Sequence, residues 1–169
     1  MFAKLENGSI FSSQILNDIK DPFAKELINL WRERDLKGYA ILYRDAIAKQ
    51  EKGLVSYDLS PVRGFILVEK SPGSEVATIR GLFVEPEARN RSIGSRLIRY
   101  VQQVVKQKAS YGEKAIWVNI TLGAENIYTR LGFKILGTRK DFPDQKIAYW
   151  GDIPLKEVSQ VKTKKCRND

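Results

Sequence analysis

Residues 82–98, "LFVEPEARNRSIGSRLI", predict the end of a strand, a short basic loop and the start of a helix in immediate succession. The preceding residues 76–84 are mostly apolar or β-branched and predict a strand, which Pro86 ends. From Ile93 onward, apolar residues recur at the spacing of one helix face, namely at Ile93, Leu97, Ile98, Val101, Val104 and Val105. Because the first N–H groups of a helix have no partner inside it, the loop is a candidate anion site.

Loops of this kind usually rely on glycine, but Gly94 is the one glycine in residues 87–97. Asn90 tolerates positive φ better than most residues with a side chain, and Ser92 is small and a favoured helix N-cap. Arg89 and Arg91 carry guanidinium groups that can bind phosphate oxygens in pairs. Taken alone, the loop fits a phosphate site and an ordinary basic helix start equally well.

The remaining pattern predicts a mixed α/β order rather than a doubly wound one. Asp21-Pro22 predicts a helix start, with Phe23, Leu27, Leu30 and Trp31 at helical spacing. A second short helix is predicted over residues 43–49. The other predicted elements are strands over residues 54–57 and 62–69 with the turn "DLSP" between them, a strand over 115–119, a short helix over 124–131, and strands over 133–138 and 147–150.

Composition narrows the class of function. The chain has 169 residues, 43% of them hydrophobic, which fits one domain with a single core. Histidine is absent and Cys166 is the lone cysteine, so His-dependent catalysis and multi-cysteine metal sites are excluded, and no metal is expected. The net charge of +9 suits an anionic partner. No apolar run is long enough to span a membrane, and the first residues lack the apolar core of a signal peptide, so we expect a cytoplasmic protein.

Two motifs carry a resemblance to a known family. Residues 82–98 resemble the acetyl-CoA signature of the GNAT N-acetyltransferase superfamily, Arg/Gln-x-x-Gly-x-Gly/Ala between a strand and a helix. Arg89 matches its first position and Gly94 its last glycine, while Ser92 replaces the first glycine. Residues 124–133, "AENIYTRLGF", resemble the second motif, Ala-x-x-x-Tyr-x-x-x-Gly-Phe. The resemblance implies a GNAT-like single α/β domain over residues 1–155, with a mixed, mostly antiparallel central sheet flanked by helices, followed by a basic tail over 156–169.

The resemblance also implies an activity, the transfer of an acetyl group from acetyl-CoA to a primary amine by direct attack. Tyr128 matches the tyrosine that protonates the departing thiolate, although its spacing alone also fits a core aromatic. The N–H of Leu82 is expected to steady the oxyanion. Asn119 is either a pantetheine contact or an ordinary turn residue at a strand end. The backbone expected to bind the cofactor is that of Leu82, Phe83 and Val84 for the pantetheine arm, and of Arg89, Asn90, Arg91, Ser92, Ile93, Gly94 and Ser95 for the pyrophosphate.

The general base is not identified by sequence. Lysine-acetylating members of the superfamily often carry a glutamate where Thr78 stands, and threonine cannot serve. Glu69, Glu85 and Glu125 are candidates by their positions near strand ends and the second motif, but each also fits a solvated surface carboxylate. A water chain or an amine that arrives neutral would suffice.

Other interpretations stay open. The substrate side is expected from the N-terminal helices and the last strands, whose aromatics are more typical of a core: Trp31, Tyr39, Tyr43, Phe142, Tyr149 and Trp150. The basic charge also fits a GNAT-fold enzyme that modifies a tRNA or DNA base, and the exchanged glycines fit a CoA-binding module without activity. The amine substrate is a small molecule or a protein, no membrane partner is expected, and a homodimer and a binding role for the tail are possible.

Overall fold

The computed structural model describes residues 1–6, 12–51, 54–70, 73–108 and 115–152. Within these residues the strands form one seven-stranded sheet in the order β1-β2-β3-β4-β5-β7-β6. Neighbouring strands are antiparallel except for β4 and β5, which are parallel. The strands are β1 (Phe2–Glu6), β2 (Gly38–Glu51), β3 (Leu54–Lys70), β4 (Val76–Val84), β5 (Ala115–Thr121), β6 (Lys134–Thr138) and β7 (Gln145–Gly151). The expected fold class, a mixed and mostly antiparallel sheet flanked by helices, is confirmed.

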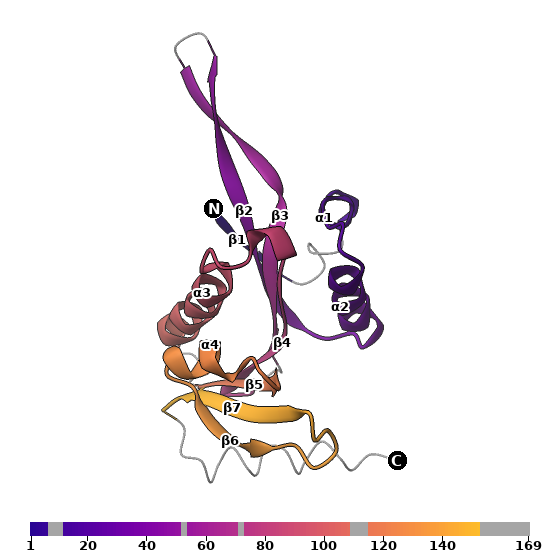
Figure 1. Ribbon diagram of the computed structural model, residues 1–169, viewed down its shortest axis with the longest axis vertical. Coiled ribbons are helices and arrows are strands. Elements are labelled where there is room, and N and C mark those ends of the chain that lie inside the picture. The colour runs from indigo at the N-terminus through magenta and orange to yellow at the C-terminus, as the bar shows by residue number, and fades with distance from the viewer. Residues whose placement is uncertain (7–11, 52–53, 71–72, 109–114, 153–169) are drawn as a thin grey trace.

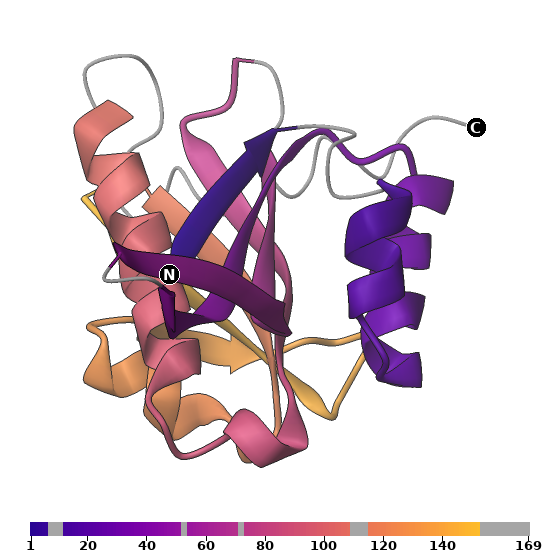
Figure 2. The same cartoon turned by 90° about the horizontal axis from the view of Figure 1, so that it is seen from above.

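Helices cover both faces of the sheet (Figures 1 and 2). The helices are α1 (Ser13–Asp18), α2 (Pro22–Glu33), α3 (Ile93–Lys108) and α4 (Glu125–Arg130). The α3 and α4 face holds the larger apolar cluster, and the α1 and α2 face holds a second one. None of these helices, in the part of the chain that the structure describes, is long and apolar enough to cross a membrane.

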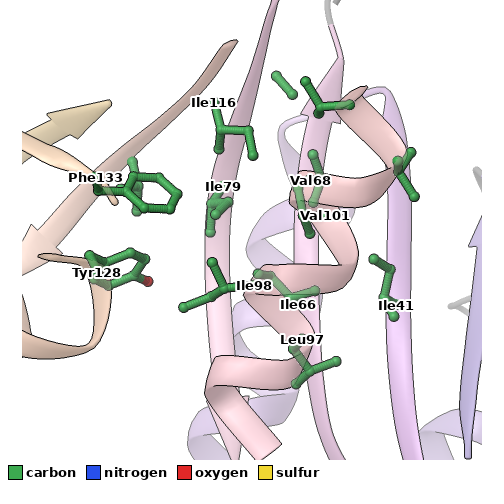
Figure 3. Close-up of a cluster of buried hydrophobic side chains, with 14 of the residues drawn as sticks. Ile41, Ile66, Val68, Ile79, Leu97, Ile98, Val101, Ile116, Tyr128 and Phe133 are labelled. Carbon is green, nitrogen blue, oxygen red and sulfur yellow. The ribbon is translucent and has the colours of Figure 1, made fainter. Parts of the chain in front are cut away.

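The helix α3 has the buried face that its sequence predicts. All six predicted apolar positions are at most 8% exposed, and they pack on the isoleucine and valine side chains of the central strands. Figure 3 shows Leu97, Ile98 and Val101 pointing toward Ile66, Val68 and Ile79 of the sheet. The predicted strands and short helix after residue 115 are also present, with Gly132 at φ 83° following Leu131, the C-cap of α4.

The predicted helix over residues 43–49 is wrong, because this segment belongs to strand β2. Residues 39–43 of β2 pair with β1 on one side and with β3 on the other, and the ladder with β3 continues to Glu51. Helix propensity is a weak preference that pairing with neighbouring strands overrides. Beyond β1 and β4 the two strands continue together as a two-stranded ribbon (Figure 1).

The predicted turn "DLSP" is also wrong, since β3 runs without interruption from Leu54 to Lys70. Pro61 within it lies opposite a register shift, where the pairing passes from Arg44 with Val62 to Ala46 with Leu59. Proline cannot donate to a ladder and is tolerated inside a sheet at such irregularities. The proline therefore marks a bulge and not the end of a strand.

The helix α2 begins where predicted but faces another way. The Asp21 side chain accepts a hydrogen bond from the N–H of Ala24 at 3.0 Å, which caps the helix. The buried residues are Ala24, Ile28 and Trp31, whereas Phe23 and Leu30 of the predicted apolar set are 58% and 38% exposed. The spacing of apolar residues therefore predicted the helix correctly, but it did not predict which side of the helix packs against the sheet.

Most aromatics expected on the substrate side belong to the core. Trp31, Tyr39, Tyr43 and Tyr149 are each at most 7% exposed, and Trp150 is partly buried. Phe142 is 46% exposed, with the Arg139 guanidinium 4.3 Å from the centre of its ring.

Candidate functional site

The sheet opens between its two parallel strands. Residues 76–79 of β4 pair with residues 115–118 of β5, and there the pairing of these two fully described strands stops. Both strands continue, β4 to Val84 and β5 to Thr121, and β5 stays paired with β7 over its whole length. The second half of β4 therefore presents to β5 an edge that no strand of the described sheet covers.

A bulge accounts for the divergence. The partner of β3 changes from Gly81 at Leu67 to Ile79 at Val68, so Arg80 is an extra residue on β4. A bulge bends its strand and increases the local twist. This turns the end of β4 away from β5.

The ladder with β3 fixes which way the backbone of Leu82 points. The N–H of Glu85 donates to the carbonyl of Arg63 on β3 at 2.9 Å. Backbone groups of alternate residues in an antiparallel strand point to opposite sides, so Phe83 shares the β3 side with Glu85. The N–H and C=O of Leu82 therefore point away from β3, into the gap.

Asn119 on β5 lies one residue beyond the last pair with β4. Its side-chain oxygen Oδ1 is buried and makes no hydrogen bond within the described part of the chain. A buried polar atom without a partner is costly, and such atoms in folded proteins usually mark a missing ligand or water. Asn119 thus places an acceptor that the described residues do not satisfy on β5, one residue beyond the point where the two strands separate.

The basic loop leads from β4 into α3 through a 3-10 turn, η2 (Pro86–Ala88). Asn90 has φ 62° and Ser92 has φ 56°, so both residues adopt the left-handed conformation that glycine normally supplies. The first bond of the helix is donated by the N–H of Arg96 to the carbonyl of Ser92 at 3.0 Å. The amides of Ile93, Gly94 and Ser95 consequently have no partner within the helix, as an anion site requires.

Both arginines of the loop contact the protein itself. Arg89 Nε donates to the carbonyl of Val84 at 3.2 Å, across the loop. Arg91 forms two hydrogen bonds with the Asp45 carboxylate on β2, with its NH2 2.8 Å from Oδ1 and its NH1 3.1 Å from Oδ2. These bonds, with a weaker one from the Tyr43 hydroxyl, hold the pKa of Asp45 below its usual range. Asp45 was missed by sequence reasoning, because it lies in the segment predicted as helical.

Gly94 is where three parts of the site meet. A Cβ placed on it would lie 3.2 Å from Cδ1 of Ile127 on α4, 3.7 Å from Cγ2 of Val84 and 3.8 Å from Cδ2 of Leu82. The glycine thus lets the start of α3, the end of β4 and helix α4 pack together. Gln102 of α3 adds a hydrogen bond to the carbonyl of Leu131, at the end of α4, at 2.8 Å.

Tyr128 lies on α4 with 5% of its surface exposed. Its ring packs edge-on against Phe133 at 5.4 Å, and its hydroxyl points toward Ile98 (Figure 3). Burial raises the pKa of the phenol to about 12. The side chain is therefore a neutral hydrogen-bond donor at physiological pH.

The three candidate bases are each paired with a cation. Glu85 accepts from Arg63 NH1 at 2.7 Å, and Glu69 is 7% exposed and accepts from Arg80 Nε at 2.5 Å. Glu125 lies 2.9 Å from Lys146 Nζ, and the hydrogen bond with that lysine lowers the pKa of Glu125. A lowered pKa makes a carboxylate a weaker base, so the pairing gives Glu125 no help in accepting a proton.

Residues 28–135 match the family described as "Acetyltransferase (GNAT) domain". The chain belongs to the GNAT acetyltransferase family. It is thus an acyltransferase of a family that uses acetyl-CoA. The match spans both motifs, and the resemblance seen in the sequence is confirmed. No curated protein sequence shows significant similarity to the chain.

Solved structures share the fold. The chain is similar to the aminoglycoside 6'-N-acetyltransferase from Enterococcus faecium, with 17% identity and a TM-score of 0.56 over 91% of this chain and 98% of that one. It is similar to Ard1 from Thermoplasma volcanium, with 16% identity and a TM-score of 0.57 over 90% and 99%. A chain of the NatC complex bound to Gag peptide and CoA has 12% identity and a TM-score of 0.56 over 90% and 99%. At these identities the likeness concerns the fold.

Proposed function

We propose that this GNAT protein transfers the acetyl group of acetyl-CoA to a primary amine, in the gap between β4 and β5. The observation that carries the proposal is the opening of the sheet beside the start of α3, whose first N–H groups have no partner within the helix. The Leu82 backbone faces the gap, and Asn119, one residue beyond the last β4–β5 pair, carries a buried acceptor without a partner among the described residues. The structurally similar proteins include an aminoglycoside acetyltransferase and a complex bound to a peptide, which supports an amine acceptor.

The residues present fit the cofactor. The edge of β4 from Leu82 to Val84 can pair with an amide-containing chain as an added strand would, through the N–H and C=O of Leu82 and the N–H of Val84. The side chain of Asn119 can take up a hydrogen bond from the same chain. The pyrophosphate would be held by the amides of residues 90–95, where the positive end of the α3 dipole adds to their effect, whereas the N–H of Arg89 donates to the carbonyl of Pro86 at 3.2 Å.

Bound acetyl-CoA supplies a thioester that is already activated toward an amine. The N–H of Leu82 faces the gap, where it would act as a fixed donor that stabilises negative charge on the thioester carbonyl oxygen. Burial raises the pKa of Tyr128 to about 12, so with the cofactor bound Tyr128 would serve as a neutral hydrogen-bond donor to the thioester sulfur. Since a thiol has a pKa of about 8.5, sharing this proton is enough to help the sulfur leave.

The cofactor is tested first. Acetyl-CoA should raise the melting temperature of the wild-type protein, because binding to the folded state alone stabilises it. The absence of any shift at millimolar acetyl-CoA would refute cofactor binding. The acceptor is then sought by thiol release with polyamines, aminoglycosides, peptides and tRNA. Turnover with tRNA alone would favour the nucleic-acid alternative, and no turnover with any acceptor would favour a module without activity.

The acid role of Tyr128 is tested separately. Tyr128→Phe should lower kcat by about 10- to 100-fold, at the modest end for general acids because a thiol leaves readily, and should preserve acetyl-CoA affinity. Tyr100→Phe on α3 is the matched control. The Tyr100 ring packs against Phe2 of β1, with 5.8 Å between the ring centroids, and not in the gap, so this substitution should leave kcat unchanged. An unchanged kcat in Tyr128→Phe across the pH range would remove Tyr128 from the mechanism.

A further inference from the structure

We propose that Asp45 is a positioning residue that clamps the cofactor loop through Arg91 and so replaces the missing glycines. Arg91 is held by a carboxylate on β2, a strand that contributes no residue to the gap. The inference rests on the proposed role of residues 90–95 in binding CoA. It adds a residue outside the family motif, on which that binding depends in this chain.

The contact has the geometry of a clamp. Two guanidinium nitrogens of Arg91 meet the two oxygens of Asp45, an arrangement that fixes orientation as well as distance. Asp45 is itself held, since the Tyr43 hydroxyl donates to its Oδ1 at 3.1 Å and Arg63 Nε lies 3.6 Å from its Oδ2. The side chain of Asp45 is 24% exposed and that of Arg91 is 50% exposed.

Arg91, which Asp45 holds, lies between the two loop residues whose backbone is strained. Asn90 and Ser92 flank Arg91 and both have positive φ, a conformation that side-chain-bearing residues disfavour. Without a restraint, the backbone of these residues would populate other conformations, and the N–H groups of the loop would lose their fixed directions. The two hydrogen bonds to Asp45 hold Arg91 in place, and with it the residue on either side.

A competing arrangement makes the opposite prediction. If Arg91 left Asp45 to bind a phosphate of CoA, the carboxylate would compete with the cofactor for the same guanidinium. Removing its charge would then tighten CoA binding. If Asp45 shapes the loop, the same substitution weakens binding. The sign of the change therefore distinguishes a clamp from a competitor.

The experiment measures the dissociation constant of CoA by calorimetry for the full chain. Asp45→Asn should weaken CoA binding by about threefold to tenfold, as expected for the loss of a charged, partly exposed pair of hydrogen bonds. The control Asp18→Asn removes the neighbouring ion pair, in which Arg44 NH2 lies 2.6 Å from Asp18 Oδ2, and should leave CoA affinity unchanged. Melting temperatures confirm that each variant is folded.

A second arm tests the reason for the effect. In a Ser92→Gly background, Asp45→Asn should weaken CoA binding less than in the wild type, because glycine adopts positive φ without a restraint. Tighter CoA binding in Asp45→Asn, or a loss of equal size in both backgrounds, would overturn the proposal. A wild-type protein that does not bind CoA would instead refute the proposed function on which it rests.

Discussion

Replacing Ser92 by glycine should stabilise the protein. Ser92 has φ 56° and an exposed side chain, so the substitution relieves a disfavoured backbone conformation and removes no core packing. A left-handed conformation costs an L-residue about 1–2 kcal/mol. Glycine avoids that cost but loses about 0.4–1 kcal/mol more backbone entropy on folding. The net gain is about 0.5–1 kcal/mol.

The assay is thermal unfolding without ligand. In a domain of this size about 1 kcal/mol corresponds to about 2–4 °C, so Ser92→Gly should raise the melting temperature by about 1–4 °C. The matched control is Ser95→Gly three residues further on, inside the first turn of α3, where the same substitution should cost about 0.5–1 kcal/mol. Equal destabilisation by both variants would show that the loop backbone at Ser92 is not strained.

Two further predictions concern Tyr128 and Gly64. The unfolded chain loses the Tyr128 proton near pH 10.0 and the folded chain near pH 12. The free energy of unfolding should therefore decrease by about 2–3 kcal/mol as the pH rises across that interval. Alkaline denaturation should therefore be less steep in Tyr128→Phe, and identical curves would exclude the raised pKa. Gly64→Ala would place a Cβ 2.8 Å from the carbonyl oxygen of Phe83 and should lower stability by about 1–3 kcal/mol in urea titrations. Its control, Gly81→Ala, meets atoms no closer than 3.5 Å, and an equal loss there would contradict the steric explanation.

The parts of the fold that sequence predicted are those specified locally. The helix α3 was predictable because its six apolar residues form one stripe, and the motifs on either side supplied the family. The segment over residues 43–49 was not, because its own composition favours a helix and its strand conformation depends on pairing with residues elsewhere in the chain. Non-local pairing leaves little trace in the sequence of one partner.

In the candidate site, too, the local features could be predicted from the sequence and the non-local contacts could not. The residue type of Asn90 predicts its positive φ, whereas that of Ser92 does not predict the positive φ found there, although Ser92 does precede α3 and its carbonyl accepts the first bond of the helix. The bidentate contact of Arg91 with Asp45 joins residues 46 positions apart, and nothing in the sequence between them indicates it. The cofactor roles of residues 82–84, 89–95, Asn119 and Tyr128 stay predictions, as does the domain boundary at residue 155, which lies outside the described residues.

The opening of the sheet has a consequence for how the chain folds. Strands β1 to β4 pair in order as antiparallel neighbours, apart from the helices inserted between β1 and β2, whereas β4 and β5 meet through only four register pairs. Parallel strands require a crossover, here residues 85–114 with α3, whose ends must be brought together before any bond between the strands forms. Pairing β4 with β5 therefore costs much loop-closure entropy and gains only a few hydrogen bonds in return. We expect it to form late, after the antiparallel ladders on either side have ordered.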